Sequence, residues 1–174
     1  MVMTPRLRKF ALTAHLTCSV GWIGAVMAYL ALVVAALSSQ DSRTLQAAWI
    51  AIEVIGWYII VPLAFASLLS GLVMALGTPW GLFRHYWVLL SLILTILATV
   101  VLLVHMQTVS DIAGIATETP SAAASGLPGE VVHAGVGMLV LLVIQVLNMY
   151  KPRGMTPYGW RKQQERRTVS PAET

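Results

Sequence analysis

Residues 10–37, which read FALTAHLTCSVGWIGAVMAYLALVVAAL, decide the fold, because this run of 28 residues contains no Asp, Glu, Lys or Arg. As a helix the run would be about 42 Å long, which exceeds the roughly 30 Å hydrocarbon core of a bilayer. The apolar region of a secretory signal peptide is only about 7–15 residues long. The run therefore predicts an uncleaved first membrane span that is tilted or projects from the bilayer.

The composition of the whole chain agrees with a membrane protein. Of its 174 residues, 57% are apolar and 10% are charged, whereas a soluble domain carries roughly 25% charged residues. The length excludes a multidomain enzyme and allows about four spans of ~20 residues each. We predict an all-α, four-helix transmembrane bundle over residues 1–150, with spans at about 10–37, 47–76, 86–106 and 130–149.

The connecting segments carry their own signals. Pro62 in the second span predicts a kink, because proline removes a helical hydrogen bond. Residues 107–129 are rich in small residues and lack Lys and Arg, which predicts an external loop with one short helix. Residues 151–174 form a basic tail without an apolar period, which predicts a cytoplasmic segment that is disordered or lies on lipid headgroups.

The positions of the basic residues predict the orientation. With both termini in the cytoplasm, ten of the eleven Lys and Arg residues lie inside and only Arg43 lies outside, as the positive-inside rule requires. We therefore expect a multi-pass protein of the cell membrane that contacts the lipid bilayer. The net charge of +4 does not indicate a nucleic-acid partner, because the basic residues flank the spans.

Small residues recur at helical spacing on three spans, and such faces are typical of helix contacts in membranes. We expect them to pack inside the bundle, although they could equally form the surface of a homo-oligomer or contact another membrane protein. They are Ala14, Gly21, Gly24, Ala25 and Ala28 on the first span, Gly56, Ala64, Ser67 and Gly71 on the second, and Gly137 on the fourth.

Ionisable residues inside spans are costly and are functional candidates by default. Glu53, His105 and His133 all fall in the outer half of the predicted bundle, and at 100° per residue each shares a face with small or polar residues. We expect these three side chains to meet. Glu130, which precedes His133 by one turn, could join them.

Two cofactors suit such a cluster. His105 and His133 on neighbouring helices could be axial ligands of a b-type haem, whereas Glu53, His105 and His133 together could bind copper or zinc. The alternative is a structural or partner-binding membrane subunit without a cofactor. No nucleotide-binding loop and no HExxH zinc motif is present, and whether the chain is an enzyme stays open.

Two histidines lie toward the cytoplasmic side. His15 shares a helical face with Ser19, Trp22 and Tyr29, which predicts a small internal polar network, and it is the less favoured cofactor ligand. His85 stands beside basic and aromatic residues and is interpreted as an interfacial anchor.

Two stretches of the chain resemble small four-span membrane proteins of actinobacteria that have no known function. They are His15 to Trp22 and Leu69 to Met106, and the segment Gly77 to Trp87 is the most distinctive part. More distantly, the histidines near the helix ends make the chain similar to the copper-resistance D and b561-type cytochrome membrane proteins. These resemblances imply a four-helix membrane bundle, and the second implies haem or copper as a ligand.

Overall fold

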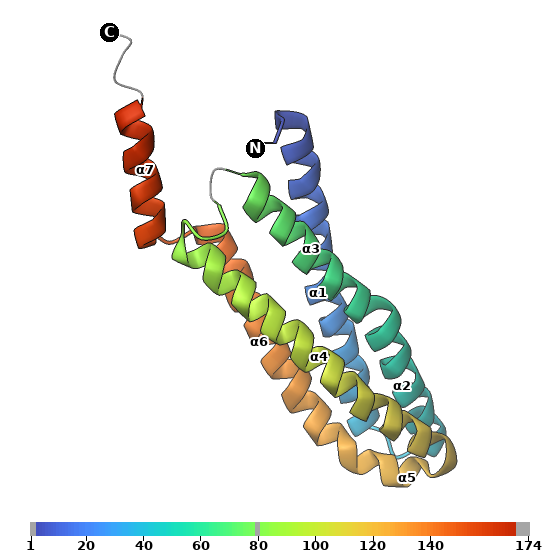
Figure 1. Cartoon of the computed structure of the whole chain (residues 1–174). Helices are drawn as coiled ribbons and strands as arrows, with labels where there is room; N and C mark the ends of the chain where they lie inside the picture. The colour runs from blue at the N-terminus through green and yellow to red at the C-terminus, as the bar shows by residue number, and fades with distance from the viewer. Residues whose placement is uncertain (1–2, 79–80, 170–174) are drawn as a thin grey trace.

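The computed structural model describes residues 3–78 and 81–169, and these residues are almost entirely helical (Figure 1). Pro79 and Trp80 of the predicted turn lie outside the described residues. The elements are α1 (Pro5–Leu37), α2 (Ser42–Ile55), η1 (Gly56–Ile60), α3 (Val61–Gly77), α4 (Tyr86–Glu118), α5 (Pro120–Ala123), η2 (Ala124–Gly126), α6 (Leu127–Tyr150) and α7 (Pro157–Val169).

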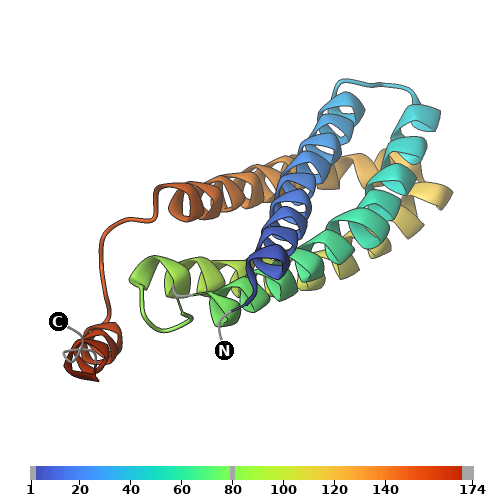
Figure 2. The ribbon, with the colours of Figure 1, turned by 90° about the horizontal axis from the view of Figure 1, so that it is seen from above.

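The predicted all-α bundle is confirmed. Four helical stretches of 33, 36, 33 and 30 residues are long and apolar enough to cross a membrane. They form a ring in which α1 packs against α2, α3 and α6, and α4 packs against the same three helices from the other side. The beginning of α1, the α3–α4 connection and the end of α6 lie at one end of the bundle, the terminal end, whereas α5 and the α1–α2 connection lie at the far end (Figures 1 and 2).

The second span is one continuous helix with a wide turn in its middle. Residues Gly56–Ile60 form a π-helical segment, in which the Val61 backbone N–H donates to the Gly56 carbonyl five residues earlier. Pro62 follows directly and has no N–H to donate. The irregularity predicted at Pro62 is therefore a π-turn that precedes the proline, a feature that is often found at functional sites.

The external loop predicted over residues 107–129 is wrong for most of its length. The helix α4 continues to Glu118, and α6 begins at Leu127. Val109, Ala113 and Ala116 recur at helical spacing and are buried, because the extension of α4 packs against α2. Only the short α5 and η2 segments connect the two helices, which agrees with the predicted short helix.

The first turn of α2 begins earlier than the predicted span. Asp41 caps this helix, since its carboxylate accepts hydrogen bonds from the Thr44 backbone N–H at 3.1 Å and the Thr44 hydroxyl at 2.9 Å. These hydrogen bonds lower the pKa of Asp41 below its usual value. The cap therefore stabilises the helix at neutral pH and loses strength as the pH falls and the carboxylate is protonated.

The basic tail contains a helix where the sequence predicts disorder. Thr156 caps α7, because its hydroxyl accepts a hydrogen bond from the Gly159 backbone N–H at 3.1 Å. Its own N–H donates to the Arg84 carbonyl, 3.0 Å away, and Met155 pairs with His85. These contacts attach the tail to the α3–α4 connection. Threonine followed by proline is a common start of a helix, a local signal that overall composition does not carry.

Large side chains fill most of the inner face of α1. Trp22, Tyr29 and Val33 are buried, whereas the small residues Gly24 and Ala28 are exposed. The expected inward packing is therefore wrong for Gly24 and Ala28, whereas Gly21 and Ala25 are partly buried and Ala25 packs against the core. On the second span, by contrast, Gly56, Ala64 and Ser67 are buried as predicted.

Gly56 allows α4 to approach the π-turn closely. A methyl group added at Gly56 would lie 2.3 Å from Met106 Cε, and Met106 is fully buried. We predict that Gly56→Ala lowers the free energy of unfolding by about 1–3 kcal/mol, the usual cost of overpacking. Thermal unfolding in detergent, followed by circular dichroism, measures the effect.

Gly135 on α6 is the matched control, because nothing lies within 4 Å of a methyl group added there. Gly135→Ala should leave stability unchanged or raise it by up to about 1 kcal/mol through the lower entropy of the unfolded chain. Equal melting temperatures of the two variants would contradict the close approach at Gly56.

Candidate functional site

A buried carboxylate joins three helices in the far half of the bundle. Glu130, in the first turn of α6, is 2% exposed. The Tyr29 hydroxyl on α1 donates a hydrogen bond to Glu130 Oε2, and His105 Nε2 on α4 lies 2.9 Å from the same oxygen. One carboxylate oxygen is therefore the meeting point of α1, α4 and α6.

The second histidine stacks on the first. His133 follows Glu130 by one turn on α6, and its ring lies parallel to that of His105, with 3.4 Å between the ring centroids and 10° between the ring planes. No hydrogen bond connects the His133 imidazole to another described residue. The expected meeting of His105 and His133 is present, and Glu130 joins them.

The electrostatics of this far-end cluster (Tyr29, His105, Glu130 and His133) follow from its depth. A carboxylate inside a span is costly unless it is paired and hydrogen-bonded. When Glu130 is ionised it only accepts hydrogen bonds, and the Tyr29 O–H and a His105 Nε2–H then both donate to it. With its proton on Nε2, a neutral His105 has an unprotonated Nδ1 with a lone pair.

An apolar cavity of about 240 Å³ lies next to the two imidazoles, between α1, α4 and α6. His105 and His133 contribute to its wall, and aliphatic side chains such as Val140 form most of the remainder. Leu97 and Val136 also line it and are more than half exposed. The cavity therefore opens sideways, through side chains that face the hydrocarbon of a bilayer.

Glu53 does not complete a metal site. Among the described residues, no group of three or more His, Cys, Asp or Glu side chains is arranged to hold a metal ion. Glu53 belongs to α2, which packs mainly against α4 and α1, whereas His133 belongs to α6 across the ring. The metal-binding set Glu53, His105 and His133 is therefore not assembled, and Glu130 is the carboxylate beside the histidines.

The other two histidines lie at the terminal end. His15 Nδ1 is 3.0 Å from Ser70 Oγ on α3, and the neighbouring hydroxyls of Ser19 and Ser67 are 2.9 Å apart. His85 is the N-cap residue of α4, which agrees with its predicted position at the end of a span. The predicted network around His15 exists, but it extends to α3 instead of along α1.

Helical angle alone places Tyr29 in the wrong group. It lies 14 residues after His15, a separation of about 21 Å along a helix, and it contacts Glu130 instead. Its depth in the first span matches that of His105 and His133, and this is the signal that could have placed it in the far-end cluster.

Comparisons with known proteins give no further assignment. No family model, no curated protein and no solved structure matches the chain.

Removing the Glu130 carboxylate should destabilise the protein, because the buried Tyr29 hydroxyl and His105 would lose their shared partner. For Glu130→Ala we predict a loss of about 3–5 kcal/mol in the free energy of unfolding, the usual cost of removing one member of a buried pair. Thermal or denaturant unfolding in detergent measures this loss.

Glu53→Ala is the matched control, since it removes an intramembrane carboxylate that no hydrogen bond or ion pair joins to the other described residues. The control should lose less than about 1 kcal/mol. An equal loss in both variants would show that the far-end cluster has no special structural role.

Proposed function

We propose that this multi-pass membrane protein binds a b-type haem in the far half of the bundle, in the cavity beside His105 and His133. The proposal is supported by one observation above all: two imidazoles from facing helices lie at the wall of an apolar cavity inside the bundle. Cofactor sites between helices of a bundle are built from such inward-facing side chains. A bound b-type haem would supply one-electron redox chemistry.

The contact between Glu130 and His105 adds support. Histidines that bind metals usually donate their other ring N–H to a carboxylate, which fixes the tautomer and the ring orientation. Glu130 holds His105 Nε2 in this way. The same contact would keep the Nδ1 lone pair of His105 available to a ligand.

The stacked arrangement favours one histidine ligand over two. Metal–imidazole bonds are about 2 Å long, so ligands on opposite faces of one haem iron would have ring centroids roughly 6 Å apart. The observed separation is 3.4 Å. Ligation by both rings would require α4 and α6 to part, so the stacking favours one imidazole, that of His105 or His133, as the ligand.

Copper or zinc is a less favoured ligand, because no described group of three candidate side chains can hold a metal ion. A metal would have to rely on His105, His133 and Glu130, and the carboxylate of Glu130 already accepts two hydrogen bonds. Metal analysis of the purified protein distinguishes these ions from haem iron.

A partner-binding membrane subunit without cofactor is the second candidate function. Gly24 and Ala28 form an exposed pair of small residues, four positions apart on α1, and such pairs allow close helix contacts in membranes.

The location that we propose is the cell membrane with the terminal end in the cytoplasm, supported by the ten basic residues at that end.

We predict that the purified protein, expressed with a sufficient haem supply, shows a Soret band that shifts after reduction with dithionite. A single histidine ligand should give a high-spin spectrum, and two ligands should give sharp α and β bands. Removal of the ligating imidazole, in His105→Ala or in His133→Ala, should lose most of the bound haem. The ratio of Soret to protein absorbance measures the occupancy, with iron, copper and zinc determined in the same sample.

His15→Ala is the control, because His15 lies at the terminal end and contacts Ser70. It should retain the haem of the wild type. Haem retained in His105→Ala, His133→Ala and the double variant would contradict the site, and a colourless wild type without stoichiometric metal would favour the partner-binding subunit.

A further inference from the structure

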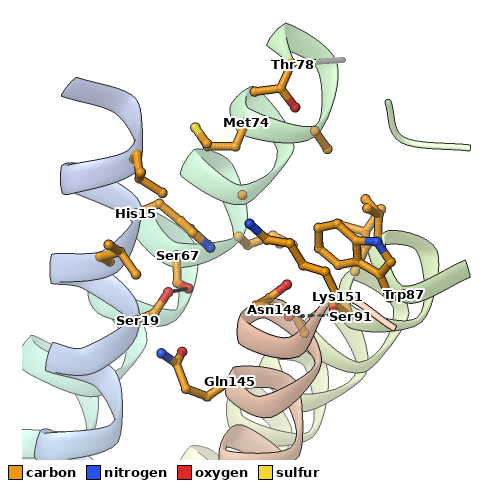
Figure 3. Close-up of a pocket in the computed structure, with 18 of the residues that line it drawn as sticks. His15, Ser19, Ser67, Met74, Thr78, Trp87, Ser91, Gln145, Asn148 and Lys151 are labelled. Atoms are coloured by element: carbon orange, nitrogen blue, oxygen red, sulfur yellow. Dashed lines mark hydrogen bonds between the residues drawn. The ribbon is translucent and has the colours of Figure 1, made fainter. Parts of the chain in front are cut away.

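A second cavity, of about 180 Å³, lies at the terminal end between α1, α3, α4 and α6 (Figure 3). Polar side chains from all four spans contribute to its wall. These polar wall residues include Ser19, Ser67, Ser91, Gln145, Asn148 and Lys151. Such a concentration of polar groups inside a membrane bundle marks a functional site by default.

Ser91 is the strongest indication that this cavity takes a ligand. The residue is 6% exposed, and its Oγ has no hydrogen-bond partner among the described residues. Thr95 and Thr99, the next polar residues on the same face of α4, both donate to the carbonyl four residues earlier. Ser91 therefore departs from the local pattern, and buried hydroxyls without partners are rare enough to require an explanation.

The charge of the cavity wall favours an anionic ligand. Lys151 follows α6 directly, in a left-handed backbone conformation with φ of 44°, and its side chain extends over the cavity toward α3 (Figure 3). Gln145 and Asn148 add amide donors, and no Asp or Glu is among the described residues that line the cavity. One ammonium group with several neutral donors suits an oxyanion that carries a single negative charge.

The rest of the wall is apolar and open to lipid. Leu12, Leu16 and Met149 line the cavity and are 44%, 45% and 73% exposed. A ligand with an anionic head could therefore place its head among the polar groups while its acyl chains leave between α1 and α6. Basic pockets between membrane helices bind anionic lipid headgroups in this way.

We propose that the terminal-end cavity binds the phosphate group of an anionic phospholipid from the adjacent leaflet. Lys151 pairs with the phosphate, and Gln145 and Asn148 donate hydrogen bonds to its oxygens or to the neighbouring headgroup. The Ser91 hydroxyl, which has almost no accessible surface, joins them when its side chain turns toward the cavity. The site is independent of the haem site, because the two cavities share no lining residue.

The test is binding of phosphatidylglycerol to the full-length protein in mixed micelles, measured by native mass spectrometry and by the shift in melting temperature. Wild type should bind one phosphatidylglycerol with preference over phosphatidylcholine. Lys151→Gln should weaken this binding about tenfold, as expected for the loss of one charge-assisted contact.

Two further variants separate a specific site from general surface charge. Arg153→Gln removes an exposed positive charge two residues away and outside the cavity wall, and it should bind phosphatidylglycerol as the wild type does. Ser91→Ala should unfold at the wild-type temperature without lipid, because its hydroxyl has no partner to lose, but it should bind phosphatidylglycerol several-fold more weakly.

Each other outcome overturns the proposal. Equal losses in Lys151→Gln and Arg153→Gln would show that only general surface charge attracts the lipid. Equal binding of phosphatidylcholine would show that the cavity does not select an anion. Stabilisation by inorganic phosphate as strong as that by phosphatidylglycerol would identify a soluble anion, not a lipid, as the ligand.

Discussion

The structure depends on the cost of placing a carboxylate inside a membrane. Glu130 is tolerable in its span only because Tyr29 and His105 both reach its Oε2. Successive residues of a helix point 100° apart, so a shift of α1 or α4 by one residue would turn the donor away. The carboxylate therefore determines the depth and rotation of three helices, and this same arrangement brings His133 against His105.

Apolar packing alone could not determine these positions, because lipid chains compete equally well for aliphatic side chains. Polar contacts toward the terminal end also position the helices. His15 contacts Ser70, and Ser19 contacts Ser67, which fixes α1 against α3. The helix α1 thus has polar contacts at both of its ends. The close approach of Gly56 to Met106 then holds the second span against α4.

Much of this arrangement could be predicted from the sequence, and the failures have physical reasons. Hydropathy and depth predicted the spans and the meeting of His105 with His133, and helical spacing added Glu130. Depth alone could not show which spans are neighbours. The predicted meeting of Glu53 with both histidines is wrong because the helix of Glu53 packs away from α6. The extension of α4 was missed because its buried face exists only against α2, and the unpartnered Ser91 hydroxyl is a property of the folded bundle alone.

The two large cavities share no described lining residue, and a much smaller cavity lies between them. A third cavity of about 30 Å³ shares Ser19 and Gln145 with the terminal-end cavity, and shares Trp22 and Leu141 with the far-end cavity. Trp22 and Leu141 are almost fully buried, at 4% and 6% exposed, and lie between the third cavity and the far-end cavity. Each large cavity opens past exposed aliphatic side chains of the spans. The ligands that we propose would therefore reach their sites from the lipid, each at its own end of the bundle.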